Sequence, residues 1–145
     1  MKNIIEEDYK CYDKLDAAYY ATDSEAEKES IRKALKAFKQ EVLDKGPAYN
    51  TYFWAYAKMK LRKNDYIDFS EVIWEDEIPG MVEALKNLGF DRFSVSSNCS
   101  GMVETAWIFE QNGCTLEGII EINSAYKEIV TEEFEKAHAF LFRIN

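Results

Sequence analysis

Histidine, proline and cysteine are all scarce in this sequence, which has one histidine, two prolines and three cysteines. The lone His138 and the lack of any cysteine pair at metal-ligand spacing exclude the common transition-metal motifs, so no metal and no cofactor is expected. Few prolines in a chain that is 47% hydrophobic indicate a folded globule rather than a disordered segment. The cysteines Cys11, Cys99 and Cys114 form no C-x-x-C pair, and their odd number leaves one unpaired. That usage is typical of a reduced, cytoplasmic protein.

The motifs of several large enzyme classes are also missing. The chain contains no G-x-G-x-x-G, no G-x-x-x-x-G-K-[ST] and no G-x-S-x-G, so neither nucleotide folds nor a hydrolase nucleophile elbow is supported. No apolar run approaches the roughly 18 residues of a membrane span. The N-terminal MKNIIEEDYK lacks the apolar core of a signal peptide. These absences favour a cytoplasmic protein that is not an enzyme and has no membrane partner.

Negative charge is abundant but uneven. The formal net charge is −9; residues 1–65 carry 13 Lys/Arg against 12 Asp/Glu, whereas residues 66–145 carry 5 against 15. Such an acidic second half repels nucleic-acid phosphates, so direct nucleic-acid binding is not expected. The acidic charge has two interpretations, a surface for a basic protein partner and a purely solubilising role, and composition alone favours the second.

Apolar residues at helical spacing predict three helices in the first sixty-odd residues. The first covers 3–21, a capping box at Thr22 or Ser24 begins the second, and Gly46-Pro47 separates the second from the third. The third is the most aromatic segment of the chain, with cations near its end. It resembles a stacking platform for single-stranded nucleic acid. Aromatic residues at helical spacing more often belong to the core, however, and we favour that interpretation.

The second half predicts alternating strands and helices. Strands are expected at 66–69, 93–96, 116–122 and 138–144, and helices at 79–88, 100–111 and 131–137. This order, β-α-β-α-β-α-β, predicts an α/β (or α+β) fold with some parallel pairing, in which about three N-terminal helices pack on a small sheet of three to four strands. With no flexible linker, residues 1–145 are expected to form a single domain, with a helical part at 1–64 and an alternating part at 65–145.

The stretch Phe93–Asn123 is expected to be the centre of the core. Its helix at 100–111 is apolar nearly all round, which predicts a helix sandwiched between layers. Gly118, in the middle of the following strand, indicates a β-bulge or a close backbone approach.

The candidate ligand site is the junction between that strand and that helix. Its residues are Ser96, Ser97, Asn98, Cys99, Ser100 and Gly101, with Glu104 one turn into the helix as the nearest acid or base. Hydroxyls, an amide and free N–H groups at a helix start can hold an anion, and a cysteine there has a lowered pKa. A phosphatase loop needs Arg six positions after the cysteine, and that position is Thr105. The other interpretation is a capped turn, because Ser, Asn and Gly are also the preferred residues of helix starts, and the residues alone favour that interpretation.

Several segments carry a resemblance to a known family: Phe93–Ser97, Val103–Trp107, Asn112–Gly118 and Lys136–Asn145. From Trp74 onward the chain resembles an uncharacterised domain-of-unknown-function family encoded on mobile elements of Firmicutes-type bacteria. The resemblance implies a bacterial accessory gene and brings no activity and no catalytic residue. Two functions therefore remain open. One is a small acidic interaction or regulatory protein, whose sharpest form is an anti-restriction or nucleic-acid-mimic role, and the other is a small-ligand or anion binder, or enzyme, that uses Ser96–Gly101.

Overall fold

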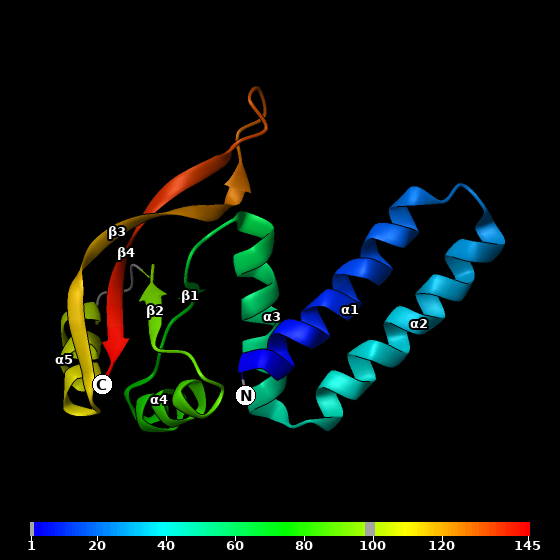
Figure 1. Cartoon of the computed structure of the whole chain (residues 1–145). Helices are drawn as coiled ribbons and strands as arrows, with labels where there is room; N and C mark the ends of the chain where they lie inside the picture. The colour runs from blue at the N-terminus through cyan, green and yellow to red at the C-terminus, as the bar shows by residue number, and fades with distance from the viewer. Residues whose placement is uncertain (1, 98–100) are drawn as a thin grey trace. The chain divides into compact units, whose positions relative to one another are not determined.

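The computed structural model describes residues 2–97 and 101–145 (Figure 1). The chain divides into an N-terminal unit, residues 1–54, and a C-terminal unit, residues 55–145. The division falls inside helix α3 (Pro47–Arg62). Three helices are followed by a four-stranded mixed sheet with interleaved helices, which confirms the predicted fold class. The single domain expected for 1–145 stays a prediction.

The N-terminal unit contains α1 (Lys2–Ala21), α2 (Glu25–Asp44) and the first half of α3. Helices α1 and α2 lie side by side and run in opposite directions (Figure 1). Ser24 is the N-cap of α2, because its hydroxyl accepts from the backbone N–H of Glu27 at 3.3 Å. Gly46, with φ +115°, separates α2 from α3 in a conformation that favours glycine. The predicted boundaries of these helices are therefore confirmed.

The aromatic side chains of α3 are buried rather than displayed. Tyr49, Tyr52, Phe53 and Tyr56 are each at most 8% exposed. In the N-terminal unit, the Phe53 ring lies 5.6 Å from the Phe38 ring, centroid to centroid. A stacking platform needs open ring faces, so these aromatics are core, as favoured from the sequence.

The C-terminal unit is built on a sheet with the strand order β1-β2-β4-β3. Its strands are β1 (Ile67–Phe69), β2 (Arg92–Val95), β3 (Cys114–Lys127) and β4 (Phe134–Ile144). Strands β1 and β2 are parallel, and the other pairs are antiparallel. The connections contain the 3₁₀ helix η1 (Glu75–Glu77), α4 (Ile78–Asn87) and α5 (Met102–Gln111). The single parallel pair is the one joined by a helical crossover, as the geometry of parallel strands requires.

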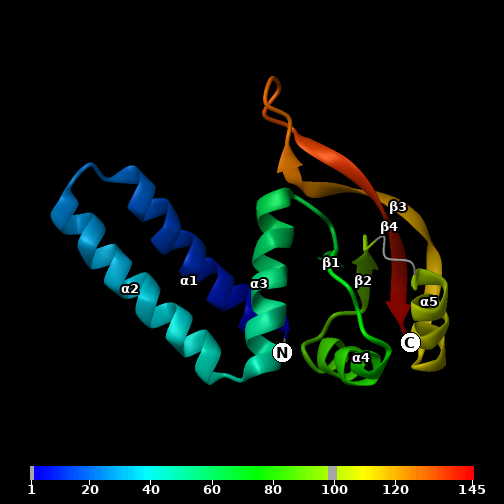
Figure 2. The ribbon, with the colours of Figure 1, turned by 180° about the vertical axis from the view of Figure 1, so that it is seen from behind.

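The helix expected at 131–137 is wrong. Strands β3 and β4 form one long hairpin, whose far end projects from the sheet in Figures 1 and 2, and β4 already begins at Phe134. Ala137 pairs with Ile122 and Phe134 with Lys127. The segment has helix-forming residues, but ladder hydrogen bonds to a strand distant in sequence decide its conformation.

The two faces of the sheet differ in chemistry. Residues paired across a ladder share a face, so Phe93 and Phe142 lie together on what we call the aromatic face. Phe109 of α5 packs there, 5.1 Å from the Phe93 ring and 4.9 Å from the Phe142 ring, and all three residues are fully buried. The opposite face, which we call the polar face, carries Asp68 and Ser94. The stretch Phe93–Asn123 thus supplies two of the three core rings, and β4 supplies the third.

Helix α5 is not sandwiched between layers. Of its residues only Thr105 and Phe109 are buried, while Val103 is 80% and Trp107 61% exposed. An apolar helix surface predicts burial only when a second layer is present, and the exposure of Val103 and Trp107 shows that the described residues do not form one over this side of α5. The expected sandwich is therefore corrected to a helix that packs through one face.

Candidate functional site

The predicted loop is only partly described. Ser96 and Ser97 follow β2, Asn98, Cys99 and Ser100 lie outside the described residues, and Gly101 and Glu104 stand at the start of α5. The lowered thiol pKa expected of Cys99 therefore remains a prediction. The described residues of the predicted site do not share one cavity. Ser96, Ser97 and Gly101 line cavities, whereas Glu104 is exposed and lines none of those described below.

Ser96 belongs to a polar cluster that the sequence did not indicate. Its hydroxyl donates to Asp68 Oδ2 at 2.5 Å, and the hydroxyl of Ser94 donates to Asp68 Oδ1 at 2.7 Å. Asp68 sits opposite Ser94 in the parallel β1–β2 ladder, so the pairing itself brings these groups together. Ser94 is fully buried, and its hydroxyl is satisfied by this carboxylate. The cluster thus holds a carboxylate in a fixed orientation where β1 and β2 end.

A cavity of about 370 Å³ opens beside this cluster; we call it the polar cavity. Its lining combines charged groups and hydroxyls with small apolar side chains: Arg62, Asp68, Ser70, Ser96, Ile122, Ser124, Ala125, Tyr126 and Ala137. It lies beyond the carboxyl ends of two parallel strands, the usual place of ligand sites in α/β sheets. Of the described members of the predicted loop, Ser96 alone lines it.

Ser97 lines a different and more apolar cavity of about 300 Å³. Val95, Met102, Ile119, Ala139 and Phe140 supply most of its wall, with Ser96 and His138 as the other polar residues. His138 is exposed and lies opposite Glu121 in the β3–β4 ladder. Ser96 and Ser97 therefore border two cavities of different character, on opposite sides of the sheet.

The third concave feature, of about 650 Å³, joins the segment before α4 to the start of α5; we call it the acidic groove. It is lined by Val72, Ile73, Trp74, Glu75, Asp76, Gly101 and Thr105. The side chains of Trp74 and Val72 are 64% and 52% exposed, so both offer apolar surface to the groove. The backbone of Trp74 is held by η1, because the N–H of Glu77 donates to its carbonyl at 3.0 Å. The indole is thus displayed from a fixed turn.

Four acidic residues lie close to Trp74 in the chain, and two of them, Glu75 and Asp76, line the acidic groove with it. Glu71, Glu75, Asp76 and Glu77 are all exposed, and none forms an ion pair with any residue that the structure describes. In the described part of the C-terminal unit, the only carboxylates in ion pairs are those of Asp91 and Glu117. The sequence signal was present as the short run Trp74-Glu-Asp-Glu, an aromatic side chain flanked by acids, but only the structure shows a groove beside it.

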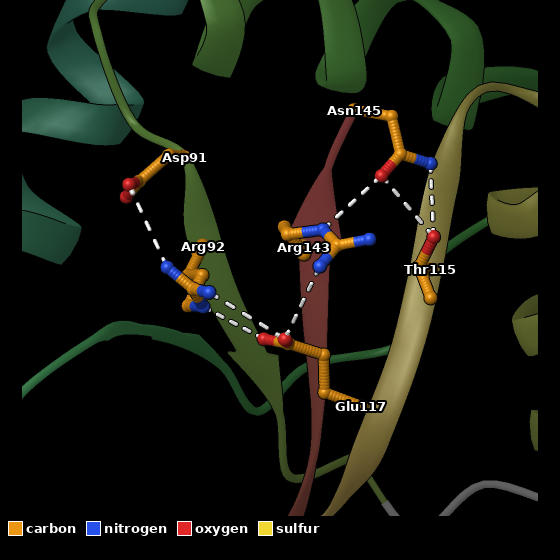
Figure 3. A network of polar contacts seen from close by, with 6 residues as sticks. All are labelled: Asp91, Arg92, Thr115, Glu117, Arg143 and Asn145. Carbon is orange, nitrogen blue, oxygen red and sulfur yellow. Dashed lines mark hydrogen bonds and ion pairs between the residues drawn. The ribbon is translucent and has the colours of Figure 1, made fainter.

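Glu117 owes its ionic partners to a β-bulge. Gly118 has φ +148° and the register shifts between Leu116 and Gly118, which confirms the predicted bulge. Space for a side chain is open at Gly118, so the alternative of a close backbone approach is wrong. The bulge lets Glu117 reach Arg92 at 2.7 Å and Arg143 at 3.8 Å, across two neighbouring strands (Figure 3).

The charged groups in Figure 3 pair with one another. Arg92 also approaches Asp91 at 3.7 Å, and the hydrogen bond from Arg92 is the main cause that lowers the pKa of Glu117. The same bond raises the pKa of Arg92. Both guanidinium groups of this network already have a carboxylate, so we read the network as a structural feature of the polar face.

Reactive groups are few in the described residues. Burial raises the pKa of Cys114 to about 11, so its thiol is protonated at neutral pH. No three His, Cys, Asp or Glu side chains within 2–97 and 101–145 cluster so as to hold a metal ion. No helix among them is long and apolar enough to cross a membrane.

Comparison with protein families places a large part of the chain in a known family. A family described as "Domain of unknown function (DUF7698)" matches residues 51–144. No curated protein and no solved structure matches the chain significantly. The matched segment contains the whole sheet, η1, α4, α5 and most of α3. It therefore includes the acidic groove and the polar cavity, and by this match the chain belongs to the DUF7698 family of domains of unknown function.

Proposed function

We propose that this protein is a small acidic interaction module that holds a basic segment of a partner protein in the acidic groove. The observation that carries the proposal is the exposed Trp74 indole among carboxylates that lack ionic partners in the described structure. An exposed patch of this kind is typical of a surface that a partner covers.

The chemistry of the groove selects a cation, and arginine in particular. A guanidinium stacks on an indole, which contributes about 0.5–1 kcal/mol when exposed and about 2 kcal/mol when water is excluded. The same planar group pairs with a carboxylate such as Glu75 or Asp76, and Val72 adds apolar contact for the partner's side-chain stem. The acidic charge of residues 66–145 attracts such a partner and disfavours nucleic acid.

The family resemblance and the cysteine content support a kind of gene and a cellular location for this module. The likeness to a family of Firmicutes-type mobile elements supports a regulatory protein of a bacterial accessory gene. The unpaired cysteines support a cytoplasmic location. In that setting the basic segment belongs to a host or element protein, whose cationic site the module occupies.

The proposal is tested with a labelled twelve-residue peptide of alternating arginine and leucine. Its binding to the full chain is measured by fluorescence anisotropy, at low and at physiological salt. We expect affinity that falls as salt rises, because the contact is partly ionic. Trp74→Ala and the double variant Glu75→Gln/Asp76→Asn should each weaken binding about tenfold, which corresponds to about 1.4 kcal/mol.

The matched control removes the same charge elsewhere, as Glu110→Gln/Glu135→Gln. Both residues are exposed and line no described cavity. The control should bind the peptide as the unchanged protein does. Equal losses in the control and the groove variants would show diffuse charge attraction and refute the groove. Full binding by Trp74→Ala would refute it as well.

A further inference from the structure

The polar cavity contains an arginine, Arg62, that has no ionic partner in the described part of the chain. Arg92 and Arg143 both pair with Glu117, whereas Arg62 pairs with no carboxylate among residues 2–97 and 101–145. Arg62 is the last residue of α3, and its side chain is partly buried. An arginine that lines a cavity and forms no ion pair in the described structure is available to an anion from outside the chain.

The backbone around Arg62 is held firmly to the sheet. Its carbonyl accepts from the side-chain amide of Asn123 at 2.7 Å. Asn64, two residues on, donates to the Asn123 carbonyl at 3.0 Å and accepts from the Asn123 backbone N–H at 2.8 Å. These three hydrogen bonds fix the end of α3 against β3, so the wall that carries Arg62 is preorganised.

The opposite charge in the cavity is held equally well. Two serine hydroxyls already donate to Asp68, yet a carboxylate offers about four acceptor positions, so capacity remains for a donor from a ligand. Ser70, Ser124 and Tyr126 add hydroxyls that both donate and accept. The cavity thus presents one cation, one carboxylate and several hydroxyls around a volume of about 370 Å³, which suits a small molecule.

We propose that the polar cavity binds a small hydroxylated anion, that is, a sugar that carries a phosphate or a carboxylate group. Arg62 receives the anionic group. Asp68 and the serines exchange hydrogen bonds with the sugar hydroxyls, and the exposed ring of Tyr126 at the rim covers the sugar's apolar face. This site is separate from the acidic groove, because the two share no lining residue.

The test is a titration of the full chain, followed by NMR chemical shifts of the backbone amides. The probes are ribose 5-phosphate, gluconate, neutral ribose and inorganic phosphate. Either or both of the first two should bind and shift amides near Ser70, Ser96 and Ser124, and the stronger of them identifies the anionic group. Neutral ribose and inorganic phosphate should each bind at least tenfold more weakly, because each lacks half of the recognised chemistry.

Variants then locate the site. Arg62→Gln should weaken binding of the anionic sugar at least tenfold, whereas Lys58→Gln, which removes an exposed cation of the same helix, should leave it unchanged. Ala125→Leu, at an exposed wall position, should block binding without unfolding the chain, and thermal unfolding checks this. Trp74→Ala should have no effect, so failure here is distinct from failure of the groove.

Three outcomes would overturn the inference. No binding of either sugar anion below about 10 mM would mean that the cavity is not a ligand site at any useful affinity. Inorganic phosphate that binds as tightly as ribose 5-phosphate would show an adventitious anion site. Equal losses in Arg62→Gln and Lys58→Gln would show that general charge, rather than the cavity, attracts the probes.

Discussion

Two separate alanine substitutions, at Phe109 and at Val103, test how α5 packs. Phe109 is fully buried between Phe93 and Phe142, so Phe109→Ala should lower the free energy of unfolding of the C-terminal unit by about 3–5 kcal/mol. That is a large part of a domain's total free energy of unfolding, which is about 5–15 kcal/mol. Val103 lies on the same helix but is 80% exposed. Val103→Ala should cost nothing and should stabilise by up to about 0.7 kcal/mol, because alanine is the better helix former.

The measurement is urea unfolding followed by NMR peaks of β2 and β4, which report on the C-terminal unit alone. A sandwiched α5, as the sequence pattern indicates, would bury Val103 instead. Val103→Ala would then remove two buried methyl groups, and at about 0.8 kcal/mol each this would destabilise the unit by about 1.6 kcal/mol. A loss of that size in Val103→Ala, or a loss below about 1 kcal/mol in Phe109→Ala, would refute the one-sided packing described above.

The remaining predictions concern a carboxylate, a thiol and two glycines. Because its guanidinium hydrogen bond lowers the pKa of Glu117, the contribution of this carboxylate to stability is present above the ordinary glutamate value of about 4.3 and lost as pH falls through the lower folded value. The urea midpoints of the unchanged chain and Glu117→Gln should therefore differ most near neutral pH and converge in acid; a constant gap would contradict this. Cys114, with a pKa of about 11, should react with iodoacetamide at pH 8 at least about tenfold more slowly than exposed Cys11, as followed by peptide mass spectrometry. Gly118→Ala should destabilise by about 1 kcal/mol or more because its φ is +148°, whereas Gly80→Ala in α4 has open space and should not; equal urea midpoints for the two would count against the bulge.

Local sequence signals located most of the secondary structure. The three N-terminal helices follow from apolar spacing and from their punctuation at Ser24 and at Gly46-Pro47. Gly118 marked the bulge correctly. These signals work because helix periodicity, caps and bulges depend on residues close together in the chain.

The errors arose where distant residues decide the conformation. Residues 131–137 read as a helix, yet pairing of β4 with β3 makes Phe134–Ala137 a strand. The apolar surface of α5 read as buried, yet burial depends on whether another layer exists. Neither the partner strand nor the missing layer is encoded in the segment itself.

The candidate site shows the same division. Sequence alone pointed to Ser96–Gly101 because serine and glycine follow a strand and precede a helix. It could not place Asp68, which lies 28 residues before Ser96 and meets it only through the parallel β1–β2 ladder. It also could not show that the end of α3 brings Arg62 to the same cavity.

By itself the sequence determined the class of fold, the acidic character of the second half and the position of most helices, because composition and short-range periodicity carry that information. Only the tertiary structure decided which carboxylates form ion pairs and which line the groove beside Trp74 with no ionic partner in the described residues. Ion pairing and cavity formation depend on strand order and side-chain direction, and these are set by contacts between residues far apart in the chain.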